Sequence, residues 1–160
     1  TEEIDLNNKI ASISCAVRCS SSEIYIGGES TIDEKTEAVI LKIESDNNVK
    51  IFYQGGVPFS YITSMTLDEM SKTIVAGGVC RAKESSGLGG VPFIASFDIA
   101  SGNELWRREY KNIGKQLLRS FVPCSDYGFI TSFSSVIQME DDIFYVASLL
   151  ARMNATGEVK

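Results

Sequence analysis

The stretch "FDIASGNELWRREY", residues Phe97 to Tyr110, decides the fold. Two runs with strand-like apolar residues flank a Ser-Gly-Asn turn, and the single tryptophan of the chain, Trp106, stands near the start of the second run. Ser, Gly and Asn between such runs are typical of a β-hairpin, because they accept the backbone angles of a tight turn. We expect Gly102 to adopt the positive φ that this turn needs.

The same pattern returns in residues 38–53 and 145–160. In each, an apolar run ends at a polar residue, a turn of Asp-Asn-Asn or Thr-Gly-Glu follows, and another run begins. Segments that start at residues 12, 63 and 119 form a second set, in which Gly27-Gly28 falls 50 positions before Gly77-Gly78 and Ser132-Phe133 takes the corresponding place. These spacings predict three repeats of about 50 to 55 residues, each with four short strands. We expect the glycine pairs where a strand ends and another repeat comes close.

Two segments also have helical features. Residues 66–72 carry Thr66 and Glu69 at the spacing of a capping box, and residues 114–121 contain helix formers. Both are too short to be stable as isolated helices, and both align with strand-like copies in the other repeats. We therefore expect strand and turn at both places.

Four short antiparallel strands in every 50 or so residues are typical of a β-propeller blade. The sequence thus predicts an all-β chain in which residues 1–160 form one propeller segment of about three four-stranded blades. Closed rings have about four to eight blades. We expect the ring to be completed either by blades of a longer chain or by a second copy in a homodimer.

The segment "SFDIASGNELW" resembles the repeat of quinoprotein-like (PQQ-like) β-propellers, in which an Asp, a Thr/Ser-Gly turn and a Trp recur once per blade. The other two copies match in part, because Glu44 and Asn154 stand at the Asp position and Ile51 at the Trp position. The resemblance implies that the Trp docks one blade onto the next, where it would bury roughly 150–250 Å². The residues of the sharp copy that match the repeat are Asp98, Ser101, Gly102 and Trp106. We expect Asp98, Gly102 and Trp106 to dock the blades.

Composition excludes several functions. The formal charge of −6 and the isoelectric point near 4.7 argue against a nucleic-acid or anionic-membrane surface. No apolar run approaches the roughly 18 residues of a membrane span. The chain has no histidine, which excludes nucleophile–His–Asp catalysis, and its four cysteines lack zinc-site spacing. We expect four mostly buried free thiols, and neither catalytic residues nor a metal or cofactor site.

One enzymatic alternative stays open, namely a fragment of a quinone- or metal-dependent propeller enzyme whose other blades are absent. Quinoprotein dehydrogenases, which the repeat resembles, use calcium, a catalytic Asp and usually a disulfide beside the cofactor. This chain has no adjacent cysteine pair. The segment "GLGG", Gly87 to Gly90, lacks the Lys-Ser/Thr that follows in a phosphate-binding loop.

Three connections of differing length follow the same point of each repeat, at residues 29–37, 80–91 and 134–142. In a propeller such connections fall on one face, and faces of this kind commonly bind partners. We therefore expect a non-enzymatic protein–protein interaction scaffold or a subunit of a larger assembly. The candidate partner-binding residues are Glu29, Asp33, Glu34, Glu37, Arg81, Lys83, Glu140, Asp141 and Asp142.

Overall fold

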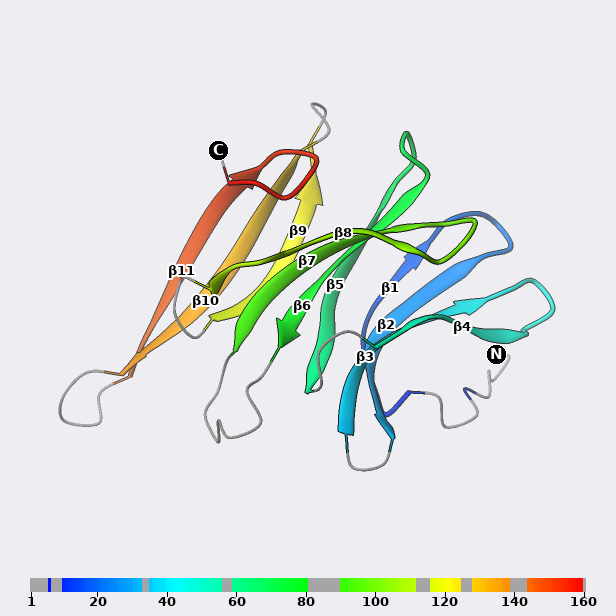
Figure 1. The fold of residues 1–160 in the computed structure, drawn as a ribbon, viewed down its shortest axis with the longest axis horizontal. Helices are drawn as coiled ribbons and strands as arrows, with labels where there is room; N and C mark the ends of the chain where they lie inside the picture. The colour runs from blue at the N-terminus through cyan, green and yellow to red at the C-terminus, as the bar shows by residue number, and fades with distance from the viewer. Residues whose placement is uncertain are drawn as a thin grey trace.

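A computed structural model describes residues 6, 10–32, 35–55, 59–80, 90–111, 116–124, 128–138 and 144–159. These residues form eleven β-strands and no helix (Figure 1), so the prediction of an all-β chain is confirmed. The described part of the chain accordingly offers no helix of the length and apolar character needed to cross a membrane.

The strands form three antiparallel sheets, each in the order of the sequence. The first sheet contains β1 (Ser12–Arg18), β2 (Ile24–Ile32), β3 (Lys35–Ile43) and β4 (Val49–Gln54). The second contains β5 (Ser60–Asp68), β6 (Thr73–Cys80), β7 (Val91–Asp98) and β8 (Glu104–Glu109). The third contains β9 (Gln116–Pro123), β10 (Phe129–Gln138) and β11 (Phe144–Met153).

Both segments with helical features are strand and turn, as predicted. Residues 66–68 end β5 and residues 69–72 form the turn that follows it. The described part of residues 114–121 belongs to β9. Pairing with neighbouring strands therefore outweighs the local helical features at both places.

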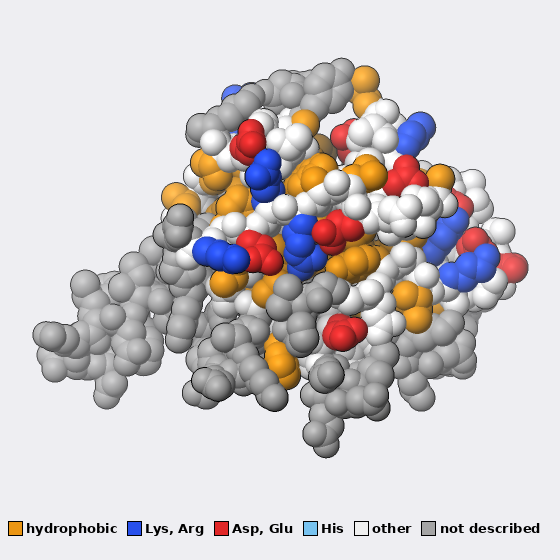
Figure 2. Space-filling view, viewed as in Figure 1, with side chains coloured by type: hydrophobic (Ala, Val, Ile, Leu, Met, Phe, Trp, Pro, Cys, Tyr) orange, Lys and Arg blue, Asp and Glu red, His pale blue; other side chains and the backbone are white. Residues whose placement is uncertain are grey.

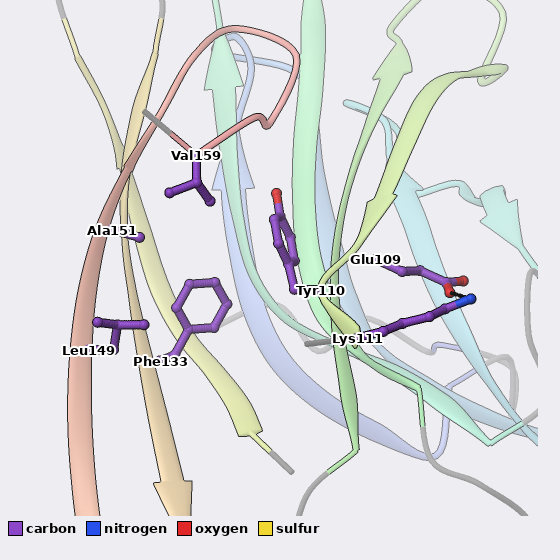
Figure 3. A pocket seen from close by; sticks show the side chains of 7 residues that line it. All are labelled: Glu109, Tyr110, Lys111, Phe133, Leu149, Ala151 and Val159. Atoms are coloured by element: carbon purple, nitrogen blue, oxygen red, sulfur yellow. Dashed lines mark ion pairs between the residues drawn. The ribbon is translucent and has the colours of Figure 1, made fainter. Parts of the chain in front are cut away.

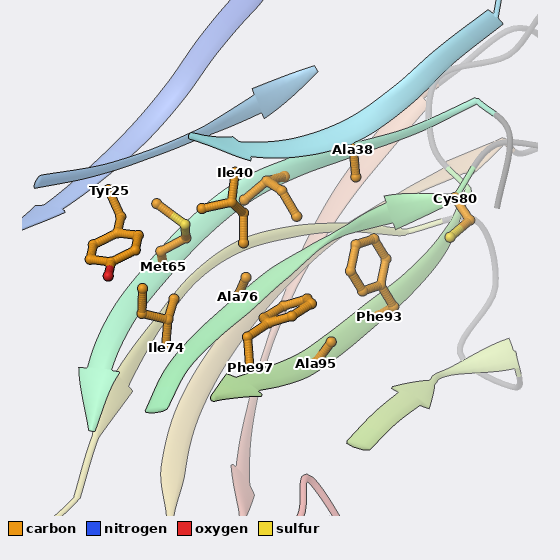
Figure 4. Close-up of a cluster of buried hydrophobic side chains, with 11 residues drawn as sticks. Tyr25, Ala38, Ile40, Met65, Ile74, Ala76, Cys80, Phe93, Ala95 and Phe97 are labelled. Atoms are coloured by element: carbon orange, nitrogen blue, oxygen red, sulfur yellow. The ribbon is translucent and has the colours of Figure 1, made fainter. Parts of the chain in front are cut away.

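The sheets stack in chain order and spread like a fan (Figure 1). Strand β5 packs against β1, β2 and β3 of the first sheet, and β9 packs against β5, β6 and β7 of the second. We call the buried cluster between the first two sheets the first contact (Figure 4); it consists of Tyr25, Ala38, Ile40, Ile62, Met65, Ile74, Ala76, Cys80, Phe93, Ala95 and Phe97. The cluster between the second and third sheets is the second contact, made of Val75, Ile94, Leu118, Phe129, Phe133 and Met153.

The second sheet is covered on both faces. Every residue of β6 is buried, and alternate residues belong to different clusters. Ile74 and Ala76 lie in the first contact, whereas Val75 lies in the second. Successive side chains of a strand point to opposite faces, and both faces of β6 are covered by other sheets. Apolar residues are therefore expected along the whole of β6.

The glycine pair of β2 departs from its predicted place. Gly27 and Gly28 lie inside the strand rather than at its end, so that part of the prediction is wrong. The close approach to another sheet does occur. A Cβ atom added to Gly27 would lie 2.9 Å from Ile62 Cγ2 and 2.9 Å from Met65 Sδ, both on β5. Absence of a side chain at this point lets β5 lie directly on β2.

Candidate functional site

The turns between the third and fourth strand positions each contain a residue with positive φ, but the backbone hydrogen bond that closes the turn joins residues four apart in the second sheet and three apart in the other two. In the second sheet the Gly102 amide donates to the Asp98 carbonyl at 2.8 Å, and beyond β11 the Gly157 amide donates to the Asn154 carbonyl at 3.0 Å. Gly102 and Gly157 have φ values of 73° and 76°, which confirms the predicted positive φ at Gly102. Asn47 takes the corresponding place in the first sheet with a φ of 59°.

The polar residue that opens the turn accepts hydrogen bonds from it in the second and third sheets. Asp98 Oδ1 accepts hydrogen bonds from the Ser101 hydroxyl and the Ser101 amide, both at 2.7 Å. These bonds lower the pKa of the Asp98 carboxyl. Asn154 Oδ1 likewise accepts from the amides of Thr156 at 3.0 Å and Glu158 at 2.8 Å. At the matching place in the first sheet the Glu44 carboxylate pairs instead with Lys50 and Lys42, so a side-chain oxygen stabilises the turn at two of the three positions.

Each turn glycine also lies against the fourth strand of the preceding sheet. A Cβ atom on Gly102 would lie 2.8 Å from the Phe52 carbonyl oxygen of β4. A Cβ atom on Gly157 would lie 3.0 Å from Trp106 Cζ3 and 3.1 Å from the Tyr110 hydroxyl. The turns are thus points of contact between sheets as well as ends of hairpins.

Alternate residues along β8 and just beyond it reach the third sheet. Trp106 is half-buried and packs against the second contact. Arg108 Nε donates to the Thr156 carbonyl at 3.3 Å. The Tyr110 hydroxyl donates to the Gly157 carbonyl at 2.6 Å. Trp106 therefore lies between two sheets, where the resemblance implies docking; its energetic role stays a prediction.

A cavity of about 260 Å³ lies beside the second contact (Figure 3). The rings of Tyr110 and Phe133 meet edge to face, with centroids 5.8 Å apart. Burial raises the pKa of Tyr110 to about 12, because the phenolate would lose its hydration. The side chains of Glu109 and Lys111, which also border the cavity, form an ion pair at 3.1 Å and point away from the other lining side chains (Figure 3). The lining residues are Glu109, Tyr110, Lys111, Phe133, Leu149, Ala151 and Val159.

The face seen in Figure 2 carries acidic and basic side chains next to one another, with exposed apolar side chains between them. The described residues include ion pairs such as Arg107–Glu104 at 3.2 Å and Lys50–Glu44 at 2.6 Å. Their charges offset one another locally, so this face presents no single-sign field to a ligand.

Two of the predicted partner-binding residues are described, and they do not come together. Glu29 and Glu37 lie within β2 and β3, so the expected loop over residues 29–37 is mostly strand. Glu29 pairs with Ala38 and Glu37 with Ser30, which places the two carboxylates on opposite faces of the sheet. Asp33, Glu34, Arg81, Lys83, Glu140, Asp141 and Asp142 lie outside the described residues.

The strand ends that flank the three connections lie on one side of the fan. The adjoining ends of β2 and β3, of β6 and β7, and of β10 and β11 point toward the lower edge of Figure 1. This agrees with the expectation that connections at one point of each repeat face the same way.

The cysteines are free thiols. Only Cys80 is buried, whereas Cys15, Cys19 and Cys124 are half-buried, so the expectation of mostly buried thiols is too strong. Burial raises the pKa of Cys15 to about 11, which keeps it a thiol at neutral pH and a poor nucleophile. Within the described residues no group of three Cys, Asp or Glu side chains is placed to hold a metal ion.

Sequence reasoning missed the cavity. One signal could have found it: Phe133 stands where another repeat has a glycine, Gly78, so a large ring replaces a bare backbone position. Two further lining residues, Leu149 and Ala151, show no such difference between repeats in the sequence.

The chain matches no protein-family model, and it matches no curated protein.

Proposed function

We propose that this chain is a β-propeller segment of about three blades that acts as a non-enzymatic protein-interaction scaffold. The observation that carries the proposal is the outward face of the third sheet. Val122, Ile130 and Leu150 are 60%, 46% and 73% exposed there. Ile130 pairs with Val122, and Leu150 pairs with Ser132 two residues further along β10, so all three side chains share this face.

The outward face of the first sheet differs from that of the third, because its apolar side chains are covered. Val39 and Leu41 are fully buried there, with Leu6 and Ile10 packed against their cluster. The chain thus covers one outer face of the stack with its own residues. Exposed apolar side chains beside an open sheet edge are what a polypeptide partner covers in other sheet proteins.

The order of the strands supports the propeller arrangement. The first strands β5 and β9 lie against the preceding sheet, while β4 and β8 form the opposite edges of their sheets. Blades stacked in a ring have this order. The acidic connections with Asp141 and Asp142 remain a second proposed contact of the same scaffold.

Charged substitutions test the outward face. Ile130→Lys combined with Leu150→Lys should remove partner proteins in an affinity capture quantified by mass spectrometry, with an unchanged melting temperature. The control, Ile51→Lys with Leu105→Lys, changes two residues that are 48% and 56% exposed on other sheets and should keep the partners. Equal capture by wild type and both variants would reject this face. Asp141→Lys with Asp142→Lys tests the connections in the same assay.

A further inference from the structure

We propose that a second cavity, between the first and second sheets, binds a planar aromatic ring of the size of indole. The cavity has a volume of about 220 Å³ and lies where the β3–β4 hairpin meets the turn after β7. None of its lining residues belongs to the buried cluster of the first contact or to the outward face of the third sheet, so the site goes beyond the proposed scaffold. The residues that the argument uses are Lys42, Lys50, Phe52, Ile99, Ser101 and Gly102.

The corresponding place beside the second contact is filled by a tryptophan. Trp106 pairs with Ser96 on β7, and Lys50 pairs with Lys42 on β3. Ser96 and Lys42 each lie two residues before the residue that opens the following turn. The strand pairing therefore puts Lys50 at the Trp position, where comparison of the sequences put Ile51.

The ring that meets the turn glycine also differs between the two places. A Cβ atom on Gly157 would lie 3.0 Å from Trp106 Cζ3. A Cβ atom on the corresponding glycine, Gly102, would lie 3.7 Å from the nearest ring atoms of Phe52. A phenyl ring is smaller than an indole, and this one lies farther from the turn. The space that Trp106 fills beside one turn is therefore partly open beside the other.

The side chain of Lys50 does not fill this space. Its ammonium donates to Glu44 Oε2 at 2.6 Å, and 56% of the side chain is exposed. The ammonium of Lys42 lies 2.6 Å from Glu23 and 3.5 Å from Glu44. The carboxylates thus hold both ammonium groups in place, and both lysines line the cavity.

The lining favours a small aromatic ring. Phe52 and Ile99 offer apolar surface, and the ammonium groups of two lysines attract the negative face of an aromatic ring. The two carboxylates offset the two positive charges, so a neutral ring is favoured over an anion. The volume is below the roughly 300–1,000 Å³ of pockets for drug-sized ligands, which limits the ligand to one small ring system.

Titration of the isotope-labelled whole protein with indole, followed by NMR, tests the site. The amide signals of Ile99, Ser101 and Gly102 should shift in a saturable manner. The signal of Gly157 should stay unchanged, because Trp106 already fills the space beside it. No shift at Gly102, or equal shifts at Gly102 and Gly157, would overturn the proposal.

An aliphatic ring tests the preference for an aromatic ligand. Cyclohexanol has no π face for the two ammonium groups, so it should bind about threefold more weakly than indole or worse. Equal binding of the two compounds would show that the cavity takes any apolar ring and would overturn the aromatic assignment.

A tryptophan at the position of Lys50 tests the correspondence between the two places. Lys50→Trp should fill the cavity with its own indole and abolish the shifts caused by added indole. The control, Ile13→Trp, adds the same side chain to a residue of the first sheet that is 53% exposed outside the cavity, and it should bind indole as the wild type does. Unchanged binding by Lys50→Trp would overturn the proposal. If this variant fails to fold, the comparison of Gly102 with Gly157 in the wild type still decides.

The same ring occurs in free indole compounds and in the tryptophan side chain of a polypeptide. N-acetyltryptophanamide, which carries the ring on a short backbone, distinguishes these sources in the same titration. Binding of both probes supports a tryptophan side chain as the ligand, and binding of indole alone supports a free small molecule. Binding of neither probe would overturn the proposal.

Discussion

The two intersheet contacts differ in how completely they are filled. At the first contact the Phe97 ring lies 4.5 Å from the Tyr53 ring and 6.5 Å from the Phe52 ring, centre to centre. At the second contact an aromatic pair, Tyr110 and Phe133, borders a cavity of about 260 Å³. The same kind of sheet stacking thus produces a close-packed layer in one place and an open one in the other.

The fourth strands explain the difference. At the first contact, β4 supplies Phe52 and Tyr53 from one side, and β8 supplies Arg107 from the other. At the second contact, β8 supplies Trp106, but the third sheet offers only Val159 among its described residues beyond the turn. A fourth strand therefore completes the packing between sheets as well as the sheet itself.

Deleting one ring at each contact gives the largest expected effect. Phe97→Ala should destabilise the fold by about 3–5 kcal/mol, because a fully packed ring is lost. Phe133→Ala should cost about 2–3 kcal/mol, since one side of that ring already borders a cavity and makes fewer contacts. Urea unfolding of both variants measures the difference. A larger loss of unfolding free energy for Phe133→Ala than for Phe97→Ala would contradict the conclusion that the second contact is less completely packed.

Removal of the tryptophan comes next. Trp106 is half-buried against the third sheet, so Trp106→Ala should cost about 2–3 kcal/mol in urea unfolding. Leu105→Ala, the change of an exposed neighbour on the same strand, should cost less than about 1 kcal/mol. A loss below about 1 kcal/mol for Trp106→Ala would remove its docking role.

The two turn glycines should respond differently to alanine. Gly102→Ala should cost about 2–3 kcal/mol, because the new Cβ meets the Phe52 backbone oxygen and the φ is positive. Gly157→Ala should cost about 1–2 kcal/mol, since Trp106, Tyr110 and Arg108 meet the new atom with side chains that can shift. Thermal unfolding compares them; the reverse order would contradict this account of the turns.

Alkaline pH should weaken the two contacts over overlapping ranges that begin at different pH values. Burial raises the pKa of Cys15 from 9.0 to about 11 and that of Tyr110 from 10.0 to about 12. In each case the unfolded chain loses its proton first, so stability present below the unfolded pKa falls as pH rises through the folded one. The Cys15 contribution falls between pH 9 and 11, and the Tyr110 contribution between pH 10 and 12.

Tyr110→Phe has the smallest expected effect at neutral pH. Loss of the 2.6 Å hydrogen bond to the Gly157 carbonyl should cost about 0.5–1.5 kcal/mol. The variant should also lose the Tyr110 share of the fall in stability between pH 10 and 12, whereas Cys15→Ala should retain that share and lose the Cys15 share between pH 9 and 11. Burial also raises the pKa values of Tyr25, Tyr53 and Cys80, so their shares persist in both variants. Unfolding curves across pH 8 to 12 decide; an unchanged profile for Tyr110→Phe would contradict the assignment.

Much of the fold could be predicted from sequence, because hairpin turns and alternation act over short distances. The positive φ of Gly102 followed from the Ser-Gly-Asn turn, and the strand at residues 116–121 from its alignment with other repeats. Gly27 was predicted at a strand end but lies inside β2, since its role is set by Ile62 and Met65 far along the chain.

The candidate site could not be predicted in the same way. The ring at this place is carried by the second strand of the third sheet, Phe133 on β10, but by the third strand of the second sheet, Phe93 on β7. The cavity depends on that difference and on whether a fourth strand pairs with the third. These are relations between distant residues. Glu29 and Glu37 show the converse, because two nearby carboxylates were separated by strand alternation onto opposite faces.

The same enlargement at the two contacts tests the central claim most directly. Ala95→Leu should destabilise the fold by about 1–3 kcal/mol, because Ala95 is fully buried in the close-packed first contact. Ala151→Leu should cost clearly less in the same urea unfolding, because Ala151 lines the cavity. Equal losses for the two variants would contradict a filled first contact and an open second one.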